Sequence, residues 1–348
     1  MSGGLRVVQP GLVTTVQDLG RIGGQRLGIP VSGALDAVAL RIANAVVGNP
    51  QGTAGLEMIA LGPVLEVEAE SVRVALGAAK GRLVVETRDG ARRDVPPLQS
   101  VRLQHGERLH CGAVAGAVVA YLAIEGGLAL PAFLGSFSTY VRGGFGGLDG
   151  RPLAAGDRLP LSRSAAETRT EMRLERFDLA PAARARVVLG PQDDYFSRSA
   201  LEAFLGSPYT VSRDADRMGL RLEGVPLEHA KGWNIVSDGI APGAIQVPGS
   251  RQPIVLLADR QTTGGYPKIA TVVSADLSAV GRLLPGMAVT FEAVSIAEAE
   301  QARRSLERDL AAIASRLVPV RADGPDLERL YEANLVSGVV CAHDAHHG

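Results

Sequence analysis

The feature that most constrains the fold is a succession of short segments with a period of two, separated by glycine-rich turns. Apolar and acidic side chains alternate over residues 65–70, and apolar positions recur at every second residue over 72–76. Successive side chains of a strand point to opposite faces, so this pattern predicts half-buried strands. An Asp-Gly pair at residues 89–90 separates two further segments of this kind and predicts a hairpin over residues 82–95.

The alternation of strands with full-length helices that would indicate a parallel α/β sheet is missing from this chain. Glycine accounts for 42 of the 348 residues and proline for 20, so tight turns are frequent. Many short strands with glycine-rich turns favour β-barrels or sandwiches. We therefore expect a mainly β protein with a few helices. One helix is expected to begin near Asp36, a good N-cap residue, and to end at residues 48–50 (GNP).

The composition changes after Leu161, where the chain becomes rich in Arg, Glu, Ala and Ser. The expected divisions are a first β domain (1–162), a linker or edge strand (163–184), a second β domain (185–296), a C-terminal helix (297–318) and a tail with a possible short helix (319–348). In the second half we expect strands at 186–189, 220–222, 254–258, 269–274 and 289–294, and short helices at 197–205 and 276–284. The C-terminal helix is predicted because Leu306, Leu310 and Leu317 fall at helical spacing.

Charge, cysteine content and missing motifs exclude several classes of protein. A formal net charge of −1 argues against a nucleic-acid partner. The apolar run at 111–124 is too short to span a bilayer, and the N-terminus shows no signal core, so no membrane association is expected. Cys111 and Cys341 form no CxxC pair, which favours a reducing, cytoplasmic location. The chain has no P-loop and no H-E-x-x-H motif, and the histidines of the tail are interpreted as a frayed end, so no bound metal is expected.

The densest group of polar residues directly follows an apolar strand at 253–258. This segment contains Asp259, Gln261, Thr262, Thr263, Gly264, Gly265, Tyr266 and Lys268. Loops of this composition present backbone N–H groups to carboxylates or phosphates. Asp259 is suited to bind magnesium or to take a proton, and Lys268 adds a point charge. The alternative is a hairpin turn with a surface ion pair.

Two further segments of the second half are candidates for binding. Gln246 and Gln252 bracket a Pro-Gly turn, and carboxamides suit amide-like ligands because they donate and accept together. Arg217 is able to clamp a carboxylate or a phosphate with two hydrogen bonds. The alternatives are that the glutamines stabilise the turn and that the arginine forms a structural ion pair.

Near the N-terminus, Gln17, Asp18, Ser32 and Asp36 are secondary candidates. The last two lead into the first helix, whose N-terminus is able to hold an anion. The alternative is an ordinary capped helix. The glycine-rich segment at 143–147 (GGFGG) runs into no helix and therefore fails as a dinucleotide fingerprint, so we interpret it as a turn between strands.

Several short segments, in order along the chain, carry a resemblance to a known family. They are residues 14–18 (TTVQD), 32–36 (SGALD), 41–44 (RIAN), 146–148 (GGL), 217–219 (RMG), 246–248 (QVP), 252–256 (QPIVL) and 261–267 (QTTGGYP). With these segments the chain resembles the family of the 5-oxoprolinase C subunit, also called KipA-like or allophanate hydrolase subunit 2. That family is related to the carboxyltransferase domain of urea amidolyase and urea carboxylase. The resemblance covers about residues 5–300.

The resemblance implies two cyclophilin-like β-barrel domains and a function in a complex. The implied partners are a KipI-like B subunit and an A subunit, and the implied reaction is the ATP-dependent opening of 5-oxoproline to glutamate. ATP and Mg²⁺ are the implied cofactors in the complex. A lactam is a poor electrophile, and phosphorylation of its carbonyl oxygen would allow water to displace that oxygen. Such a site needs amide donors, a cation and a carboxylate for magnesium.

These needs lead to a hypothesis for each candidate residue. We expect Asp259 and Lys268 to be catalytic, and Arg217, Gln246 and Gln252 to bind the substrate together with residues 261–266. Two positions depart from the family pattern. Leu76 stands where the family has a threonine, which puts a hydroxyl contact there in doubt. Glu125 stands where the family has a small residue, which indicates a local structural difference.

Two other functions fit the same resemblance. The first is a biotin-dependent carboxyltransferase acting on urea or a related small amide. Because neither Lys80, Lys231 nor Lys268 has methionine neighbours, no biotin is expected to be covalently bound to this chain. The second is a KipA-like antagonist that binds an inhibitor of a histidine kinase.

Overall fold

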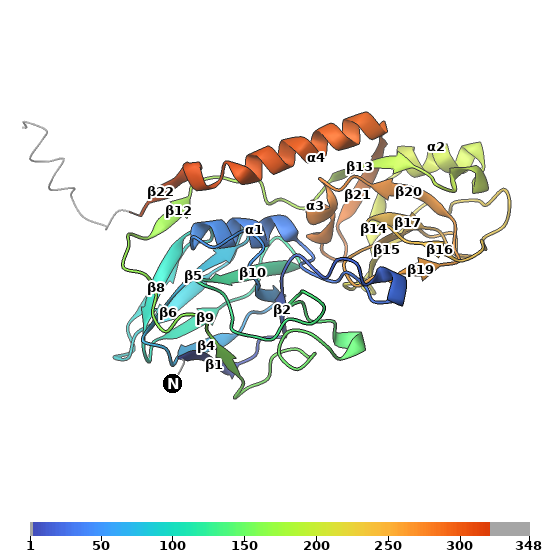
Figure 1. The fold of residues 1–348 in the computed structure, drawn as a ribbon. Coiled ribbons are helices and arrows are strands. Elements are labelled where there is room, and N and C mark those ends of the chain that lie inside the picture. Colours follow the sequence, from blue (N-terminus) through green and yellow to red (C-terminus); the bar gives the residue numbers. More distant parts are fainter. Residues whose placement is uncertain (1–2, 321–348) are drawn as a thin grey trace, which may run out of the picture.

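The computed structural model describes residues 3–320 of the chain. It consists of two β bodies, one from each half of the sequence, with helix α4 (Ile296–Ala311) running along one side of both (Figure 1). From residue 321 on, the tail lies outside the described residues, and with it the possible short helix, Cys341 and the histidines of the tail.

The first β body is built from two antiparallel sheets. One sheet has the order β11 (Arg158–Pro160), β1 (Gly4–Gln9), β4 (Val64–Val67), β9 (Arg108–Cys111), β6 (Leu83–Glu86) and β7 (Arg92–Val95). The other has the order β2 (Val13–Gln17), β3 (Gly55–Ile59), β10 (Val119–Ile124), β5 (Ser71–Gly77) and β8 (Ser100–Gln104). The predicted alternation is confirmed in β4, where Leu65 and Val67 are buried and Glu66 forms ion pairs with Arg6 and Arg108.

Strand β5 is buried along its whole length because helix α1 (Ala37–Val46) and the linker together cover its outer side. The helix begins as predicted, since the Asp36 carboxylate accepts the Ala39 N–H at 3.0 Å. Gly77 permits this close packing, because a Cβ atom there would lie 2.3 Å from the Ala39 carbonyl oxygen. Leu76 points to the opposite side, into the core between the sheets, so it supplies packing in place of a hydroxyl.

The second β body is a closed barrel of seven strands. Their order is β13 (Arg184–Leu189), β20 (Lys268–Val272), β17 (Ala244–Gln246), β18 (Ile254–Leu256), β15 (Gly219–Glu223), β14 (Tyr209–Val211) and β21 (Ala288–Ala293), which returns to β13. Its core includes the aromatic rings of Phe204, Tyr209 and Phe291. Helices α2 (Arg198–Gly206) and α3 (Leu277–Gly281) correspond to the predicted short helices. The mainly β fold expected from the sequence is confirmed.

Most of the linker lies against the first β body, whereas Ala182 near its end packs in the core of the second. Buried Arg73 of β5 donates to Glu171 and to the carbonyls of Glu167 and Arg169, and it pairs with Glu125 at 2.9 Å. Glu125, the departure from the family pattern, is therefore one half of a buried ion pair that fixes this linker.

The C-terminal helix is shorter than the sequence predicts. Strand β12 (Met172–Leu174) pairs with β22 (Leu317–Pro319), so Leu317 belongs to a strand instead of a helix. Helix α4 ends at Ala311, and a 3-10 turn, η4 (Ala314–Arg316), joins it to β22. No helix within residues 3–320 has the length and apolar character needed to cross a membrane.

Candidate functional site

The two β bodies meet at a buried junction centred on Arg217, which lies between β14 and β15. Its guanidinium pairs with Glu57 of β3 and with Asp259, whose Oδ2 atom lies 2.8 Å from Nε. It also donates to the Gly33 carbonyl at 2.6 Å. Burial would lower the pKa of Arg217, but the two carboxylates outweigh burial and raise that pKa above its ordinary value. Arg217 is therefore a cation whose donors are engaged by groups of both halves of the chain.

Asp259, three residues after the end of β18, is the second-half carboxylate of the junction. Its Oδ1 atom accepts the hydroxyl of Ser32 and one N–H of Arg217 at 3.2 Å. Ser32 adopts a left-handed backbone conformation with φ of +57°, which is unusual for a residue with a side chain. This conformation places a hydroxyl of the first half against a carboxylate of the second. Three of the sequence candidates are thus brought together, because Asp259 contacts both Arg217 and Ser32.

On the first-half side of the junction, Glu57 is held by a tyrosine that sequence reasoning missed. The Tyr121 hydroxyl donates to Glu57 at 2.5 Å and accepts the Asp36 N–H at 2.8 Å. Burial, together with the Glu57 and Asp36 carboxylates nearby, raises the pKa of Tyr121 well above its ordinary value. Tyr121 is therefore a neutral donor that keeps Glu57 directed at Arg217.

A second buried ion pair crosses the junction at the start of α1. Arg282, which follows α3, donates to the Asp36 carboxylate at 2.5 and 3.1 Å. The Ser278 hydroxyl of α3 accepts the Val38 N–H at 3.2 Å. Asp36 therefore caps its helix and links the two halves, so its carboxylate occupies the place at which an anion would bind.

A separate group of polar side chains, the amide cluster (Asp238, Gln246, Gln261 and Lys268), lies at one end of the barrel. Gln261 Nε2 donates to Gln246 Oε1 at 3.3 Å, and Gln246 Nε2 donates to the Tyr266 carbonyl at 3.4 Å. The Lys268 ammonium is buried and lies 3.0 Å from Asp238 Oδ2. A hydrogen bond from Lys268 lowers the pKa of Asp238. Within residues 3–320, the buried Gln261 Oε1 atom has no hydrogen-bond partner.

The expected bend after the apolar strand is present and supports the amide cluster. Its Thr263–Gly264 segment forms β19, which pairs with β16 (Asp238–Gly239) and so brings Asp238 to Lys268. The Thr262 carbonyl accepts the Ile240 N–H at 3.0 Å, and the Gly265 carbonyl accepts the Ile235 N–H at 2.8 Å. Much of the backbone of this bend is thus used to hold the loop that precedes β17.

Two aromatic side chains lie beside the amide cluster. The rings of Trp233 and Tyr266 are 6.1 Å apart, and both side chains remain partly exposed. Gly249 lies under the indole, since a Cβ atom there would lie 3.2 Å from the ring of Trp233. The arrangement presents an apolar surface next to amide groups and an ammonium, which is a suitable environment for a small polar ring.

The remaining candidates have local structural partners. Gln252 exchanges hydrogen bonds with the backbone N–H and carbonyl of Gly224, which favours the interpretation that it stabilises a turn. The Asp18 carboxylate accepts the Ser136 hydroxyl at 2.7 Å and the Phe137 N–H at 2.7 Å. Gln17 donates to Thr15 and Thr139. Asp18 and Gln17 thus organise the loop between β10 and β11.

The glycine-rich segment of that loop packs around a buried arginine that sequence reasoning missed. Arg21 donates to the Ser138 carbonyl and stacks on Phe145, with 4.9 Å between the guanidinium carbon and the ring centroid. A Cβ atom on Gly146 would lie 2.0 Å from the same carbonyl oxygen, so only glycine fits there. Burial lowers the pKa of Arg21. The segment is a packed turn between strands, as its sequence predicts.

The residues described contain no ready-made cluster of metal ligands. No group of three or more His, Cys, Asp or Glu side chains in residues 3–320 is arranged to hold a metal ion. The Asp259 carboxylate, the ligand expected from the sequence, is neutralised by Arg217 and bonded to Ser32. In this arrangement Asp259 does not fit the role of a magnesium ligand.

Glu57, Tyr121, Arg282, Asp238 and Trp233 are the site residues that the sequence did not reveal. A signal existed for Glu57, because it is a charged residue within an otherwise apolar strand. Tyr121, by contrast, lies in a run of apolar residues and resembles any core residue.

The fold and the junction define a two-part β protein whose halves are joined by buried ion pairs. Residues 27–293 match the family model "Carboxyltransferase domain, subdomain A and B", and the chain belongs to this family. It is 37% identical over 319 residues to the 5-oxoprolinase C subunit of Escherichia coli (strain K12), covering 90% of this chain and 98% of that protein. It is 35% identical to the Haemophilus influenzae protein of the same name over 295 residues, 84% of this chain and 92% of that protein.

Solved structures of larger proteins contain the same fold. The Kluyveromyces lactis urea amidolyase matches 89% of this chain with a TM-score of 0.80 and 28% identity. TTHA0988 matches 83% of this chain with a TM-score of 0.74 and 36% identity. The chain spans 20% of the amidolyase and 55% of TTHA0988, so it matches only a part of each of these proteins.

Proposed function

We propose that this chain is a subunit of an ATP-dependent 5-oxoprolinase complex that converts 5-oxoproline to glutamate. Its partners in this proposal are a KipI-like B subunit and an A subunit. The likeness to the 5-oxoprolinase C subunit supports the proposal, because it extends over nearly all of the Escherichia coli protein. That relative is named as a subunit, which implies a complex of several chains.

The observation that carries the proposal is the amide cluster beside an exposed aromatic pair. A five-membered lactam offers one N–H donor, one carbonyl acceptor and, in 5-oxoproline, a carboxylate. Gln261 Oε1 is buried, has no hydrogen-bond partner among the residues that the structure describes, and is an acceptor of the right kind for the lactam N–H. The Lys268 ammonium, whose acidic partner is the half-exposed Asp238, is suited to pair with the carboxylate of the substrate. Trp233 and Tyr266 would cover the ring.

This assignment gives Asp259 and Arg217 a different role from the one expected from the sequence. Both belong to the junction, where each neutralises the other and joins the two β bodies. In the proposal they position the segment that carries Gln261 and Lys268. ATP and Mg²⁺ remain requirements of the assembled complex, and we assign neither of them to a residue of this chain.

The experiment is coexpression of this chain with B-type and A-type subunits, followed by an assay of ATP-dependent glutamate release from 5-oxoproline. Lys268→Ala and Gln261→Ala should each lower turnover at least about a hundredfold, as for the loss of a positioned polar group in an active site. Lys231→Ala is the matched control, because Lys231 is an exposed lysine paired with Asp194. Normal turnover in the Lys268→Ala complex would remove the proposed site, and absence of turnover in the wild-type complex would remove the proposed function.

A biotin-dependent carboxyltransferase is the second candidate function. The family match and the likeness to urea amidolyase favour it. In that case biotin would arrive on another protein, and avidin would inhibit turnover with urea or a related amide. Tight binding to the B-type subunit without turnover in either assay would instead favour the KipA-like antagonist. We further propose that the protein acts in the cytoplasm, in keeping with its low cysteine content.

A further inference from the structure

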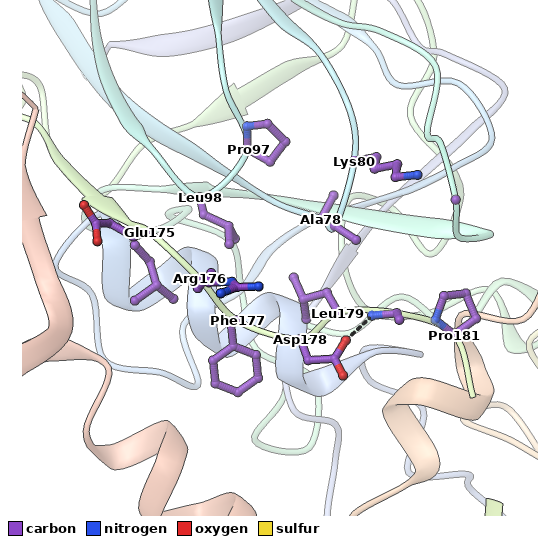
Figure 2. Close-up of a pocket in the computed structure, with 14 residues that line it drawn as sticks. Ala78, Lys80, Pro97, Leu98, Glu175, Arg176, Phe177, Asp178, Leu179 and Pro181 are labelled. Atoms are coloured by element: carbon purple, nitrogen blue, oxygen red, sulfur yellow. Dashed lines mark hydrogen bonds between the residues drawn. The ribbon is translucent and has the colours of Figure 1, made fainter. Parts of the chain in front are cut away.

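A cavity of about 450 Å³ lies on the first β body, outside the junction and the amide cluster. It is bounded by the turn after β5, by residues 97–98 and by the linker segment 174–181 (Figure 2). Its volume falls within the range of sites for small molecules, roughly 300–1,000 Å³. None of the roles discussed so far uses it.

The wall of the cavity is held in place from several directions. Leu174 N–H donates to the Leu98 carbonyl at 2.9 Å, and Arg316 donates to the Arg176 carbonyl at 2.7 Å. Arg282 of the junction donates to the Ala180 carbonyl at 3.2 Å. A cavity whose wall is fixed in this way is formed before any ligand arrives, so binding does not have to order the wall.

Leu98 lines the cavity in a strained backbone conformation. Its φ is +60°, a left-handed value that costs energy for a residue with a branched side chain. Hydrogen bonds at its N–H, to Leu76, and at its carbonyl, from Leu174, maintain this conformation. Strain of this kind persists only where the surrounding structure imposes it, and it is concentrated at binding sites.

The chemistry of the lining is apolar within and cationic at the rim. Ala78, Leu98 and Leu179 are buried and form the apolar part. Figure 2 shows Lys80 and Arg176 bordering the cavity from two different segments. Neither cation has an acidic partner within residues 3–320, although the other two lysines pair with Asp194 and Asp238.

Two acidic residues also border the cavity, and each has a contact on its own segment. Asp178 accepts the Ala180 N–H at 2.9 Å, the contact drawn as a dashed line in Figure 2. Glu175 lies 3.5 Å from Arg173, which is not part of the lining. Lys80 and Arg176 are therefore two cations without an ion-pair partner within residues 3–320, next to an apolar floor and two carboxylates whose positions are fixed by other contacts.

We propose that this cavity is a second binding site, which takes a small carboxylate with an apolar body. The carboxylate would pair with Lys80 and Arg176, and the apolar body would lie on Leu98 and Leu179. The site is separate from the amide cluster, so the proposal does not depend on the reaction that the complex carries out.

The test uses the full chain, hexanoate as the probe and ligand-observed NMR titration as the measurement. Hexanoate should bind, and hexanamide, which has a similar shape without the charge, should bind about tenfold more weakly, since one charge-assisted contact is lost. Lys80→Gln and Arg176→Gln should weaken hexanoate binding to a similar extent. Ala79→Trp should abolish it, because Ala79 is an exposed residue of the lining that a large ring would extend across the opening.

The matched control is Lys231→Gln, an exposed lysine on the second β body, which should bind hexanoate like the wild type. The substituted rim residues are exposed, so these variants are expected to fold. Failure of the wild type to bind hexanoate would overturn the proposal. Equal binding of hexanoate and hexanamide, or unchanged binding in Lys80→Gln, would overturn it as well.

Discussion

Arg217 is expected to contribute more to the stability of the junction than any other single residue, because it neutralises two interior carboxylates, Glu57 and Asp259. Replacing it with methionine keeps much of the apolar stem and removes the charge. Glu57 and Asp259 would then be buried beside each other without a cation. We expect Arg217→Met to lower the free energy of unfolding by about 3–5 kcal/mol, measured by urea denaturation.

The control for this variant is Arg142→Gln, which breaks an exposed ion pair with Asp216 across the same two halves. Because both partners of that pair face water, the loss should stay within about 0.5 kcal/mol. An Arg217→Met protein as stable as the wild type would show that the junction carboxylates are not held as charges.

Asp157 provides a pH-dependent prediction. Its carboxylate accepts two hydrogen bonds from Arg151, at 2.7 and 2.9 Å, and these contacts lower the pKa of Asp157. A lowered pKa means that the ionised group stabilises the fold above the unfolded-state pKa of about 4, and that this contribution is lost as the pH falls below it. Asp157→Asn should therefore cost about 1–2 kcal/mol at pH 7 and much less near pH 3.

The measurement is urea denaturation of wild type and variant at both pH values. Asp149→Asn is the control, since Asp149 is largely exposed and lies 3.6 Å from the same arginine. A stability difference for Asp157→Asn that is the same at pH 7 and pH 3 would contradict the prediction.

Among single residues, the sequence predicts those whose polar side chains stand in a short, recognisable motif. Asp259, Arg217 and Ser32 were selected because each stands in a polar, glycine-containing segment, and the structure brings them into contact. Their partners Glu57 and Tyr121 were missed because a buried polar residue has no local signature. Its role depends on which strand from elsewhere in the chain packs against it, and period-two patterns do not contain that information.

Among the elements, the linker has the most distinctive behaviour, since polar contacts fix a segment that has few bulky apolar residues. Glu171 accepts hydrogen bonds from Arg73 and from Ser100. Glu171→Ala removes these contacts and leaves Arg73 paired with Glu125. Tryptic cleavage after Arg169 and Arg173 should then be about tenfold faster, because opening of the segment becomes easier by about 1.5 kcal/mol.

The rate is measured by mass spectrometry of the peptides released from the folded chain. Glu175→Ala is the control on the same linker, because Glu175 forms only an exposed contact with Arg173. Equal cleavage rates in the two variants would show that packing alone, and not the Arg73 cluster, fixes the linker.

Element boundaries show where sequence patterns stop being informative. The helix after Asp36 and the hairpin at 82–95 were predicted because their signals are local: a capping carboxylate and an Asp-Gly turn. The helix predicted at 297–318 was too long at its end. Leu317 has the right spacing for a helix, but it pairs with Leu174 in a strand, and that partner lies far away in the sequence.

At the scale of the whole molecule, the two β bodies have separate cores and are joined mainly by polar contacts. One core lies between the sheets of the first half, and another fills the barrel of the second. Leu35 is an apolar residue of the first half that packs against the second core, next to Gly281. A third apolar cluster packs α1 against Leu310 and Ile313 near the end of the chain that the structure describes, and Arg217 and Arg282 add buried ion pairs that couple the folding of the two bodies.

This coupling can be measured because Trp233 is the only tryptophan of the chain and lies in the second half. Its fluorescence reports on the barrel, whereas far-UV circular dichroism reports on both bodies. For the wild type we expect the two probes to give coincident urea transitions, the mark of a single cooperative unit. In the double variant Arg217→Met/Arg282→Met the buried cations of the junction are gone, so the transitions should separate.

The control is the double variant Arg142→Gln/Lys231→Gln, in which two exposed ion pairs are lost and the two transitions should stay coincident. Separate transitions already in the wild type would mean that the bodies fold independently, and the junction would then serve only to orient them.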